Sequence, residues 1–315
     1  MNELTDDCVA CGTDGRDAPR FEAREVQDMT GEQFTYRCCR GCGSLQITDV
    51  PDDLAKYYDA SSYSSFSVKT SLVDRPVIQN PLSRAALRTV GAVHRRTGRG
   101  IGLRFVRDAG ISPDQSVLDI GSGIGENLVH MRLLGHRELV GTDPFLPEDV
   151  DRNGVKVLRR HHTEITGTYD WVVMNHSFEH VADPHAMLAS AARVLAPGGR
   201  ILVRMPVMGS AAWTRYGMDW CQIDAPRHLV LYTPAAVESM AQAAGLTVER
   251  QFYDSWSFQF WGSELISRGL PHKGASMAQA RAHFTKKQIA AWEKQSRVLN
   301  ERGDGDAAGY VLTRA

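Results

Sequence analysis

The chain has 315 residues, too many for one minimal domain and enough for a core domain with additions. Its 36 Lys and Arg residues balance 37 Asp and Glu residues, so the overall charge gives no indication of a nucleic-acid partner. No stretch approaches the roughly 20 apolar residues of a membrane span, and the N-terminus lacks a signal peptide's basic start and apolar core. We therefore expect a soluble cytoplasmic protein whose cysteines are reduced unless they bind metal.

Five of the six cysteines lie before residue 43, and four of them form two C-x2-C turns that are each followed by glycine. Two such turns can present four thiolates to one tetrahedral ion. Residues 21–26 and 33–37, between the turns, predict a small β-hairpin. We predict a zinc ribbon over residues 1–50 with structural zinc, in preference to disulfides or redox dithiols. Its ligands are Cys8, Cys11, Cys39 and Cys42, although Cys38 could replace Cys39.

Residues 51–108 are predicted to form a connector and a helical segment. Residues 51–83 are rich in Ser and Tyr and contain three prolines, which favours a loop that folds over a ligand. Residues 84–107 carry seven arginines and no acid. A solvated helical face explains this run, and a contact for a phosphorylated or nucleic-acid substrate is the alternative. The rest of the chain has no matching basic excess, so the first explanation is favoured.

A nucleotide-binding βαβ unit is predicted at residues 116–144. Residues 117–120 form a short apolar run typical of a buried parallel strand. The glycines of G-S-G-I-G, residues 121–125, let the backbone turn sharply and approach a ligand. Helical spacing follows over residues 127–134, and residues 138–141 predict a second strand that ends near Asp143. An acid about 20 residues beyond the loop is expected to bind a ribose hydroxyl.

The loop reads G-x-G-x-G, whereas a dinucleotide site requires G-x-G-x-x-G with a helix N-terminus aimed at pyrophosphate. Asp119 precedes the loop and Glu126 follows it. Acids at these positions repel phosphates but suit a cationic cofactor without phosphate. The stretch resembles motif I of the class I S-adenosylmethionine-dependent methyltransferases. The resemblance implies that the loop wraps the methionine end of the cofactor and that the acid of the next strand binds the ribose. The cofactor residues expected are Asp119, Gly121, Ser122, Gly123, Gly125, Asp143 and Asn175.

Further strands are predicted at residues 154–158, 169–174, 200–205 and 247–253, with helices at 184–195 and 235–244 between them. Alternating strands and helices indicate a parallel, doubly wound α/β sheet, whose ligands bind beyond the carboxyl ends of the strands. The segments LAPGGRILVRMP and NHSFEHVADP resemble the corresponding turn and post-strand segment of the methyltransferases. The resemblance covers about residues 115–207 and implies a Rossmann-like methyltransferase fold.

Catalytic groups are expected just after the fourth strand, where His176, Glu179 and His180 follow one another. The two histidines are candidate general bases because histidine titrates near neutral pH. A purely structural role for Glu179 and His180, holding the loop by hydrogen bonds, is the alternative. The segment after the strand lacks the [N/D]-P-P-[Y/F] sequence common in amine methyltransferases of nucleobases, which disfavours that substrate class.

An aromatic-rich insertion at residues 208–234 is predicted to form an acceptor-binding lid. Its D-x-P-R-H-L run resembles a zinc-ribbon-bearing subgroup of methyltransferases associated with sugar, polysaccharide and secondary-metabolite pathways. His228 in this run is a candidate base or substrate ligand, with a structural histidine as the alternative. Together with His176, Glu179 and His180, it also resembles the magnesium site of small-RNA 2′-O-methyltransferases, which is a Glu-x2-Glu-His segment with a later His. In this chain His176 stands where that segment has its first Glu, which disfavours an oxygen-rich metal site.

Residues 256–270 and 275–302 look helical, and residues 308–313 could form a last strand that pairs with the sixth across this insertion. The methyltransferase domain is assigned to residues 109–315, with a helical insertion at 256–303. We predict O-methylation of a small-molecule acceptor, possibly phosphorylated or nucleotide-linked: a sugar, nucleotide-sugar or secondary metabolite. The alternatives are an RNA methyltransferase, which the charge disfavours, and a non-catalytic binding module that keeps the cofactor fold.

Overall fold

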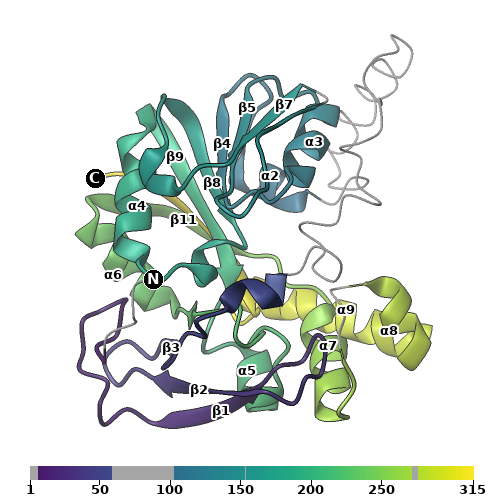
Figure 1. Ribbon diagram of the computed structural model, residues 1–315. Helices are drawn as coiled ribbons and strands as arrows, with labels where there is room; N and C mark the ends of the chain where they lie inside the picture. The colour runs from purple at the N-terminus through teal and green to yellow at the C-terminus, as the bar shows by residue number, and fades with distance from the viewer. Residues whose placement is uncertain (1–5, 59–102, 153, 272–275) are drawn as a thin grey trace.

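The computed structural model describes residues 6–58, 103–152, 154–271 and 276–315, and two β-sheets organise them. The larger sheet has eight strands in the order β11-β12-β9-β8-β4-β5-β7-β6, and the smaller has four in the order β1-β2-β3-β10. Figure 1 shows the smaller sheet beneath the end of the larger one. Most of the predicted connector, including most of the arginine-rich run, lies outside the described residues. None of the described helices is long and apolar enough to cross a membrane.

The larger sheet has a parallel centre, β7-β5-β4-β8-β9, with antiparallel strands at both edges. The chain runs from β4 outward to β5 and β7, and then returns to place β8 on the other side of β4. The order therefore reverses between β4 and β8, which is where doubly wound sheets bind ligands. The strands are β4 (Val117–Ile120), β5 (Leu139–Thr142), β6 (Val150–Arg152), β7 (Val155–Leu158), β8 (Tyr169–Asn175), β9 (Leu195–Pro206), β11 (Leu246–Tyr253) and β12 (Ala307–Arg314).

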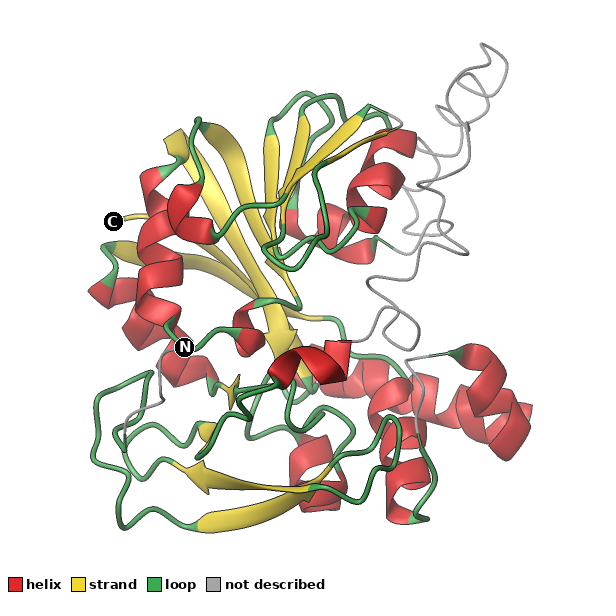
Figure 2. Cartoon of the chain, in the orientation of Figure 1, coloured by secondary structure: helices red, strands yellow, loops and turns green. Residues whose placement is uncertain are grey.

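Two hydrophobic cores lie on opposite faces of this sheet because side chains alternate along each strand. In β8, Val172 and Met174 belong to one core, whereas Trp171 and Val173 belong to the other. The first core includes residues of α4 (Pro184–Arg193) and α6 (Pro234–Ala243), and the second those of α2 (Arg104–Ala109) and α3 (Glu126–Leu133). Helices thus cover both faces, as Figure 2 shows, and the predicted doubly wound α/β fold is confirmed.

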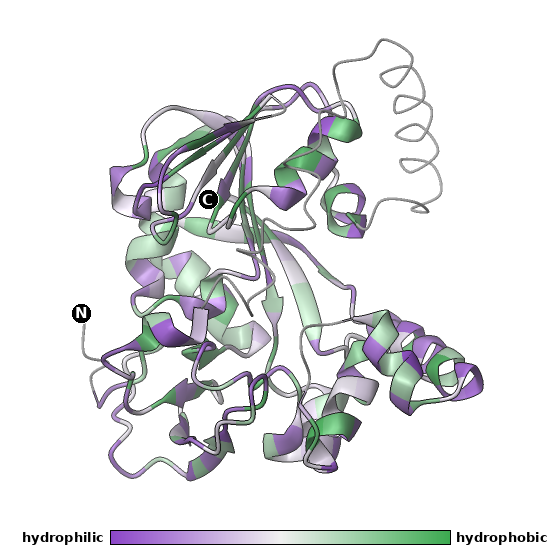
Figure 3. Ribbon diagram, turned by 45° about the vertical axis from the view of Figure 1, so that its right-hand side comes forward, coloured by the Kyte–Doolittle hydropathy of each residue, from purple (hydrophilic) through white to green (hydrophobic). Residues whose placement is uncertain are grey.

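The C-terminal helical insertion lies between β11 and β12, which pair as the sequence predicted; the structure shows that the pairing is antiparallel. It contains α7 (Phe258–Ser267), α8 (Met277–His283) and α9 (Lys286–Arg302). The prediction of one helical run over residues 275–302 is wrong, because Phe284 and Thr285 have extended backbone between α8 and α9. Thr285 caps α9 reciprocally with Gln288, a T-x-x-Q capping box that starts a new helix. Hydrophilic and hydrophobic residues alternate along the helices of the C-terminal insertion in Figure 3, as expected for helices with one buried face.

The smaller sheet joins the N-terminal segment to the insertion predicted as a lid. The expected hairpin forms from β1 (Arg20–Arg24) and β2 (Gln33–Cys38), and β3 (Leu45–Ile47) extends it. The fourth strand, β10 (Val230–Leu231), comes from the insertion, which also contains α5 (Ala211–Tyr216). The two segments therefore share one sheet. The division of the chain at residues 50 and 108 stays a prediction.

Candidate active site

A cavity of about 250 Å³ lies where the strand order reverses. Its walls come from the carboxyl ends of β4 and β5 and from the segments that follow β4, β5, β7 and β8, as the fold predicts. A short helix, η1 (Leu54–Tyr58), contributes Tyr58 from the N-terminal side. The lining residues include Tyr58, Gly121, Gly123, Asp143, Phe145, His162, His176, Ser177, His180 and Met187.

The glycine loop after β4 is shaped by close packing against the segment after β8. Gly121 has a φ of +77°, and a Cβ added there would lie 2.5 Å from the Cβ of Ser177. The hydroxyl of Ser177 donates a hydrogen bond of 2.7 Å to the carbonyl oxygen of Ile120. Only glycine combines this backbone conformation with such an approach. Gly121 therefore sets the separation between the cofactor loop and the segment that carries His176.

Two buried carboxyl groups lie at this loop. Asp143 accepts the backbone N–H of Gly123 at 3.0 Å and that of Phe145 at 2.9 Å, so it joins the end of β5 to the glycine loop. Burial nevertheless raises the pKa of Asp143. Burial, with the charge of Asp143, raises the pKa of Asp119 to about 8. One carboxyl oxygen of Asp119 has no hydrogen-bond partner among the described residues. A cationic ligand compensates for such a concentration of acid, whereas a phosphate is repelled.

The other residues expected at the cofactor lie outside the cavity wall. Gly125 has a φ of +84° and precedes α3, and Ser122 occupies the space beside Gly141. The side-chain oxygen of Asn175 accepts a hydrogen bond of 3.1 Å from Arg204. Gly121, Gly123 and Asp143 line the cavity, so the structure places these three of the predicted cofactor residues directly at it.

Several cavity residues were not predicted from the sequence. Phe145 is 63% exposed and stacks on Tyr58 with the ring planes 8° apart. His161 and His162 follow β7 and line the same cavity. Phe145 lies two residues beyond Asp143, and the two histidines follow a predicted strand at its carboxyl end. The rule that ligands bind at this edge of the sheet could have indicated all three.

The four predicted catalytic residues form one cluster. Glu179, which is fully buried, accepts a hydrogen bond from Nδ1 of His176 at 3.2 Å. Nε2 of His228 lies 3.9 Å from the same carboxylate oxygen, and the rings of His180 and His228 are 4.8 Å apart between centroids. Burial opposes ionisation of Glu179, but the hydrogen bond from His176 and the neighbouring histidines outweigh it and lower the pKa to about 2. Burial lowers the pKa of His180 to about 4, which keeps this ring neutral.

His176 also lines a second cavity, of about 130 Å³, on the side of the helical insertion. His176 has a φ of +53°, uncommon for a residue other than glycine. The second cavity is bounded by the carboxyl end of β9, the start of β12, the lid and the residues around the start of α7. Its lining combines an aromatic pair with charged and amide groups: His176, Arg204, Gln222, Ser255, Trp256, Phe258, Gln259, Asp306 and Ala307.

Residues of the D-x-P-R-H-L run have two roles: some hold the fold together and one belongs to the candidate site. Arg227, with a side chain 1% exposed, pairs with Asp224 at 2.7 Å and with Glu25 of the N-terminal segment at 3.2 Å. Its backbone oxygen accepts a hydrogen bond of 2.7 Å from His180. Asp224 and Arg227 therefore attach the lid to the N-terminal segment, while His228 joins the cluster around Glu179.

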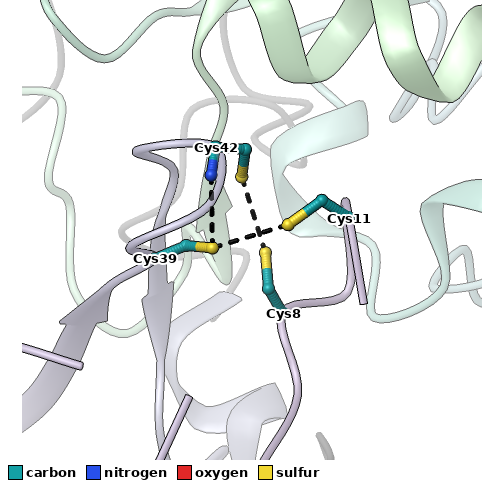
Figure 4. A group of neighbouring side chains, drawn as sticks. All are labelled: Cys8, Cys11, Cys39 and Cys42. Atoms are coloured by element: carbon teal, nitrogen blue, oxygen red, sulfur yellow. Dashed lines mark hydrogen bonds between the residues drawn. The ribbon is translucent and has the colours of Figure 1, made fainter. Parts of the chain in front are cut away.

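The four predicted cysteine ligands lie together at the N-terminal sheet (Figure 4). Sγ of Cys8 is 3.7 Å from that of Cys42, and Sγ of Cys11 is 3.5 Å from that of Cys39. Thiolates about 2.3 Å from a tetrahedral zinc are about 3.8 Å apart, so the spacing suits this ion. Cys38 instead points its sulfur toward the carbonyl oxygen of Gly43. The four cysteines could bind zinc.

A parallel-centred sheet with an acidic, glycine-lined cavity at its switch point defines a nucleotide-binding protein of the Rossmann-like class. The family model described as "Methyltransferase domain" matches residues 92–251, about half of the chain, so the chain belongs to this family. The protein is a class I S-adenosylmethionine-dependent methyltransferase, as the sequence predicts. A search of curated proteins found no match.

Solved structures of methyltransferases are similar to the chain. A complex of the Haloferax volcanii Trm112 methyltransferase activator with a methyltransferase is 17% identical, covering 71% of this chain and 97% of the other, with a TM-score of 0.45. A methyltransferase from Thermotoga maritima is 16% identical, covering 73% and 94%, with a TM-score of 0.43. The Burkholderia thailandensis 1,6-didemethyltoxoflavin-N1-methyltransferase is 19% identical, covering 55% and 82%, with a TM-score of 0.36.

The residues at the cavity fit S-adenosylmethionine. This cofactor carries a positive sulfonium and no phosphate, which suits the buried carboxyl groups of Asp119 and Asp143. The approach of Gly121 and Gly123 leaves backbone, rather than side chain, against the ligand.

Proposed function

We propose that this methyltransferase methylates a hydroxyl oxygen of a small polyhydroxylated acceptor, in the class of sugars, nucleotide-sugars and secondary metabolites. The observation that carries the proposal is the position of His176, which lines both the 250 Å³ cavity and the 130 Å³ cavity. A side chain that lines two adjoining cavities is placed to act where a ligand in one cavity reacts with a ligand in the other. The larger cavity is assigned to the cofactor and the smaller to the acceptor.

The lining of the smaller cavity supports a hydroxyl-bearing acceptor. Arg204 and Gln222 supply donors, and Asp306 supplies an acceptor. The side-chain oxygen of Gln259 has no hydrogen-bond partner among the described residues. A hydroxyl both donates and accepts hydrogen bonds, so it can satisfy each of these groups. The ring pair of Trp256 and Phe258 offers an apolar surface beside them.

His176 is assigned as the group that takes up the hydroxyl proton. Its Nδ1 lies 3.2 Å from Glu179, whose carboxylate only accepts hydrogen bonds, so Nδ1 carries the ring proton. Nε2 is then the basic nitrogen. Glu179 acts as a positioning residue, and we keep His180 and His228 as further members of the catalytic cluster. When bound, S-adenosylmethionine supplies an electrophilic methyl group.

The glycine loop and the four cysteines are assigned to the cofactor and to zinc. Gly121, Gly123 and Asp143 hold the cofactor, and Asp119 supplies negative charge behind the loop when its carboxyl group ionises. The four cysteines hold structural zinc, because a site with four protein ligands leaves no position for a substrate. The zinc ribbon and the D-x-P-R-H-L run support the subgroup associated with sugar and secondary-metabolite methylation.

The first experiment measures S-adenosylmethionine binding by calorimetry and methyl transfer to a panel of sugars and nucleotide-sugars. His176→Asn is the informative variant, because asparagine tolerates a positive φ better than most residues. We expect nearly unchanged cofactor affinity and a kcat lowered about 10²–10⁴-fold, the usual contribution of a general base. His185→Asn, at an exposed histidine nearby, serves as the control and keeps its activity.

Three results would each contradict one part of the proposal. A folded wild type that binds no S-adenosylmethionine would remove the cofactor assignment. A His176→Asn enzyme that retains its kcat would remove the role of His176. Methylation of RNA, but of no member of the acceptor panel, would replace the acceptor class.

A further inference from the structure

Glu179, His180 and His228 form a cluster of potential metal ligands beside the cofactor cavity. One candidate ligand atom from each of the three lies within 4.8 Å of those of the other two. Glu179 and His180 belong to the short helix η6 (Phe178–His180) after β8, and His228 comes from the lid. The cluster adjoins the cavity directly, because His180 forms part of its wall.

Both histidines are oriented by backbone carbonyl groups. Nδ1 of His180 lies 2.7 Å from the carbonyl oxygen of Arg227, and Nδ1 of His228 lies 2.7 Å from that of Gln222. A carbonyl oxygen only accepts hydrogen bonds, so each Nδ1 carries the ring proton and each Nε2 keeps a free electron pair. Metal-binding histidines are commonly held in this way, since the carbonyl fixes the tautomer that presents Nε2 to the ion.

Glu179 supplies an independent observation. Its side chain is fully buried, and Oε2 has no hydrogen-bond partner among the residues that the structure describes. A buried carboxylate oxygen without a partner costs free energy, so it points to a missing cation or donor. Nε2 of His228 lies 3.9 Å from Oε1, too far for a hydrogen bond.

We infer that Glu179, His180 and His228 bind a divalent first-row transition-metal ion, separate from zinc at the four cysteines. Two imidazole nitrogens and one carboxylate oxygen suit such an ion better than magnesium, which prefers oxygen ligands throughout. Three protein ligands would leave coordination positions open on the ion, and one of the three, His180, forms part of the cavity wall. An acceptor hydroxyl bound at an open position would be acidified by the ion. Only this last role rests on the proposed function; the binding of the ion does not.

The test uses the full-length protein with its cysteine site loaded with zinc, without cofactor or acceptor. Co²⁺ is the probe, because its visible absorption distinguishes nitrogen and oxygen ligands from thiolates, and total metal is counted by mass spectrometry. We expect one bound Co²⁺ per chain without a thiolate-to-cobalt band. Glu179→Gln and His228→Asn each abolish the Co²⁺ equivalent and keep the zinc. His185→Gln, at an exposed histidine outside the cluster, binds both metals.

Either of two outcomes overturns the inference: wild-type protein that binds no Co²⁺ beyond the cysteine site, or binding that both cluster variants retain. Circular dichroism of each variant establishes that it is folded, and the wild-type titration decides the question even where a variant does not fold. Because no cofactor or acceptor is present, failure of this site leaves the proposed methyl transfer standing.

Discussion

Gly121→Ala tests how closely the cofactor loop must approach the catalytic segment. The substitution places a side chain at a φ of +77°, which costs about 1–2 kcal/mol. It also puts the new Cβ 2.5 Å from that of Ser177, and relieving such an overlap in a packed site costs about 1–3 kcal/mol more. We expect the free energy of unfolding to fall by about 2–5 kcal/mol in total.

Gly198→Ala is a matched control. Gly198 has a φ of +75°, nearly the same as Gly121, but an added Cβ meets nothing within 4 Å. This variant therefore measures the cost of the backbone conformation alone, about 1–2 kcal/mol. The difference between the two variants isolates the overlap with Ser177.

The functional consequence follows from the same contact. Relief of the overlap moves Ser177, the neighbour of His176, and a misplacement of about 1 Å can cost about 100-fold in rate. Chemical denaturation gives the two unfolding free energies, and calorimetry with a methyl-transfer assay gives cofactor affinity and kcat. Replacing Ser177 by glycine in the Gly121→Ala background removes the opposing Cβ and should restore part of both losses. Equal destabilisation of the two alanine variants, with unchanged cofactor affinity and kcat, would refute the reasoning.

Three further predictions concern charge and metal. The pKa of Asp119, about 8 when folded against 3.8 in the unfolded chain, means that this group's contribution to stability is full below pH 3.8 and is lost as the pH rises toward 8. Binding of cationic S-adenosylmethionine should strengthen as this carboxyl ionises. Asp119→Asn should flatten the pH dependence of stability, measured by thermal unfolding, and that of cofactor affinity, measured by calorimetry. If either pH dependence survives in the variant, the carboxyl of Asp119 is not its cause. Arg227→Met should destabilise the protein by about 3–5 kcal/mol in chemical denaturation, because it removes the guanidinium that pairs with the two carboxylates of Glu25 and Asp224 in a buried site. Arg200→Met, which breaks an exposed pair, is the control and should cost about 0–1 kcal/mol. Chelation of the four-cysteine site should release one zinc per chain and lower the melting temperature, and a metal-free protein with an unchanged melting temperature would contradict this.

The sequence by itself determined the parts of the protein that are local along the chain. The strand, glycine loop, helix and acid from Val117 to Asp143 are consecutive, so their residue types and spacing predict both the βαβ unit and its ligand edge. The C-x2-C spacing likewise favoured Cys39 over Cys38, and the structure brings Cys39 to the cluster. Thr285 and Gln288 carried a readable capping signal that the prediction of one long helical run overlooked.

Only the tertiary structure decided how distant segments meet. His228 lies beside Glu179 because β10 pairs with β3 and brings the lid against the N-terminal sheet. A strand of two residues is too short for its pairing to be predicted from the sequence. The same docking buries Arg227, so its charge serves an ion pair with Glu25 rather than a substrate. The second cavity depends on the insertion between β11 and β12, and no local pattern predicts that it closes against His176. Residue types and short spacings are encoded locally, whereas burial and the meeting of side chains arise only when the whole chain packs.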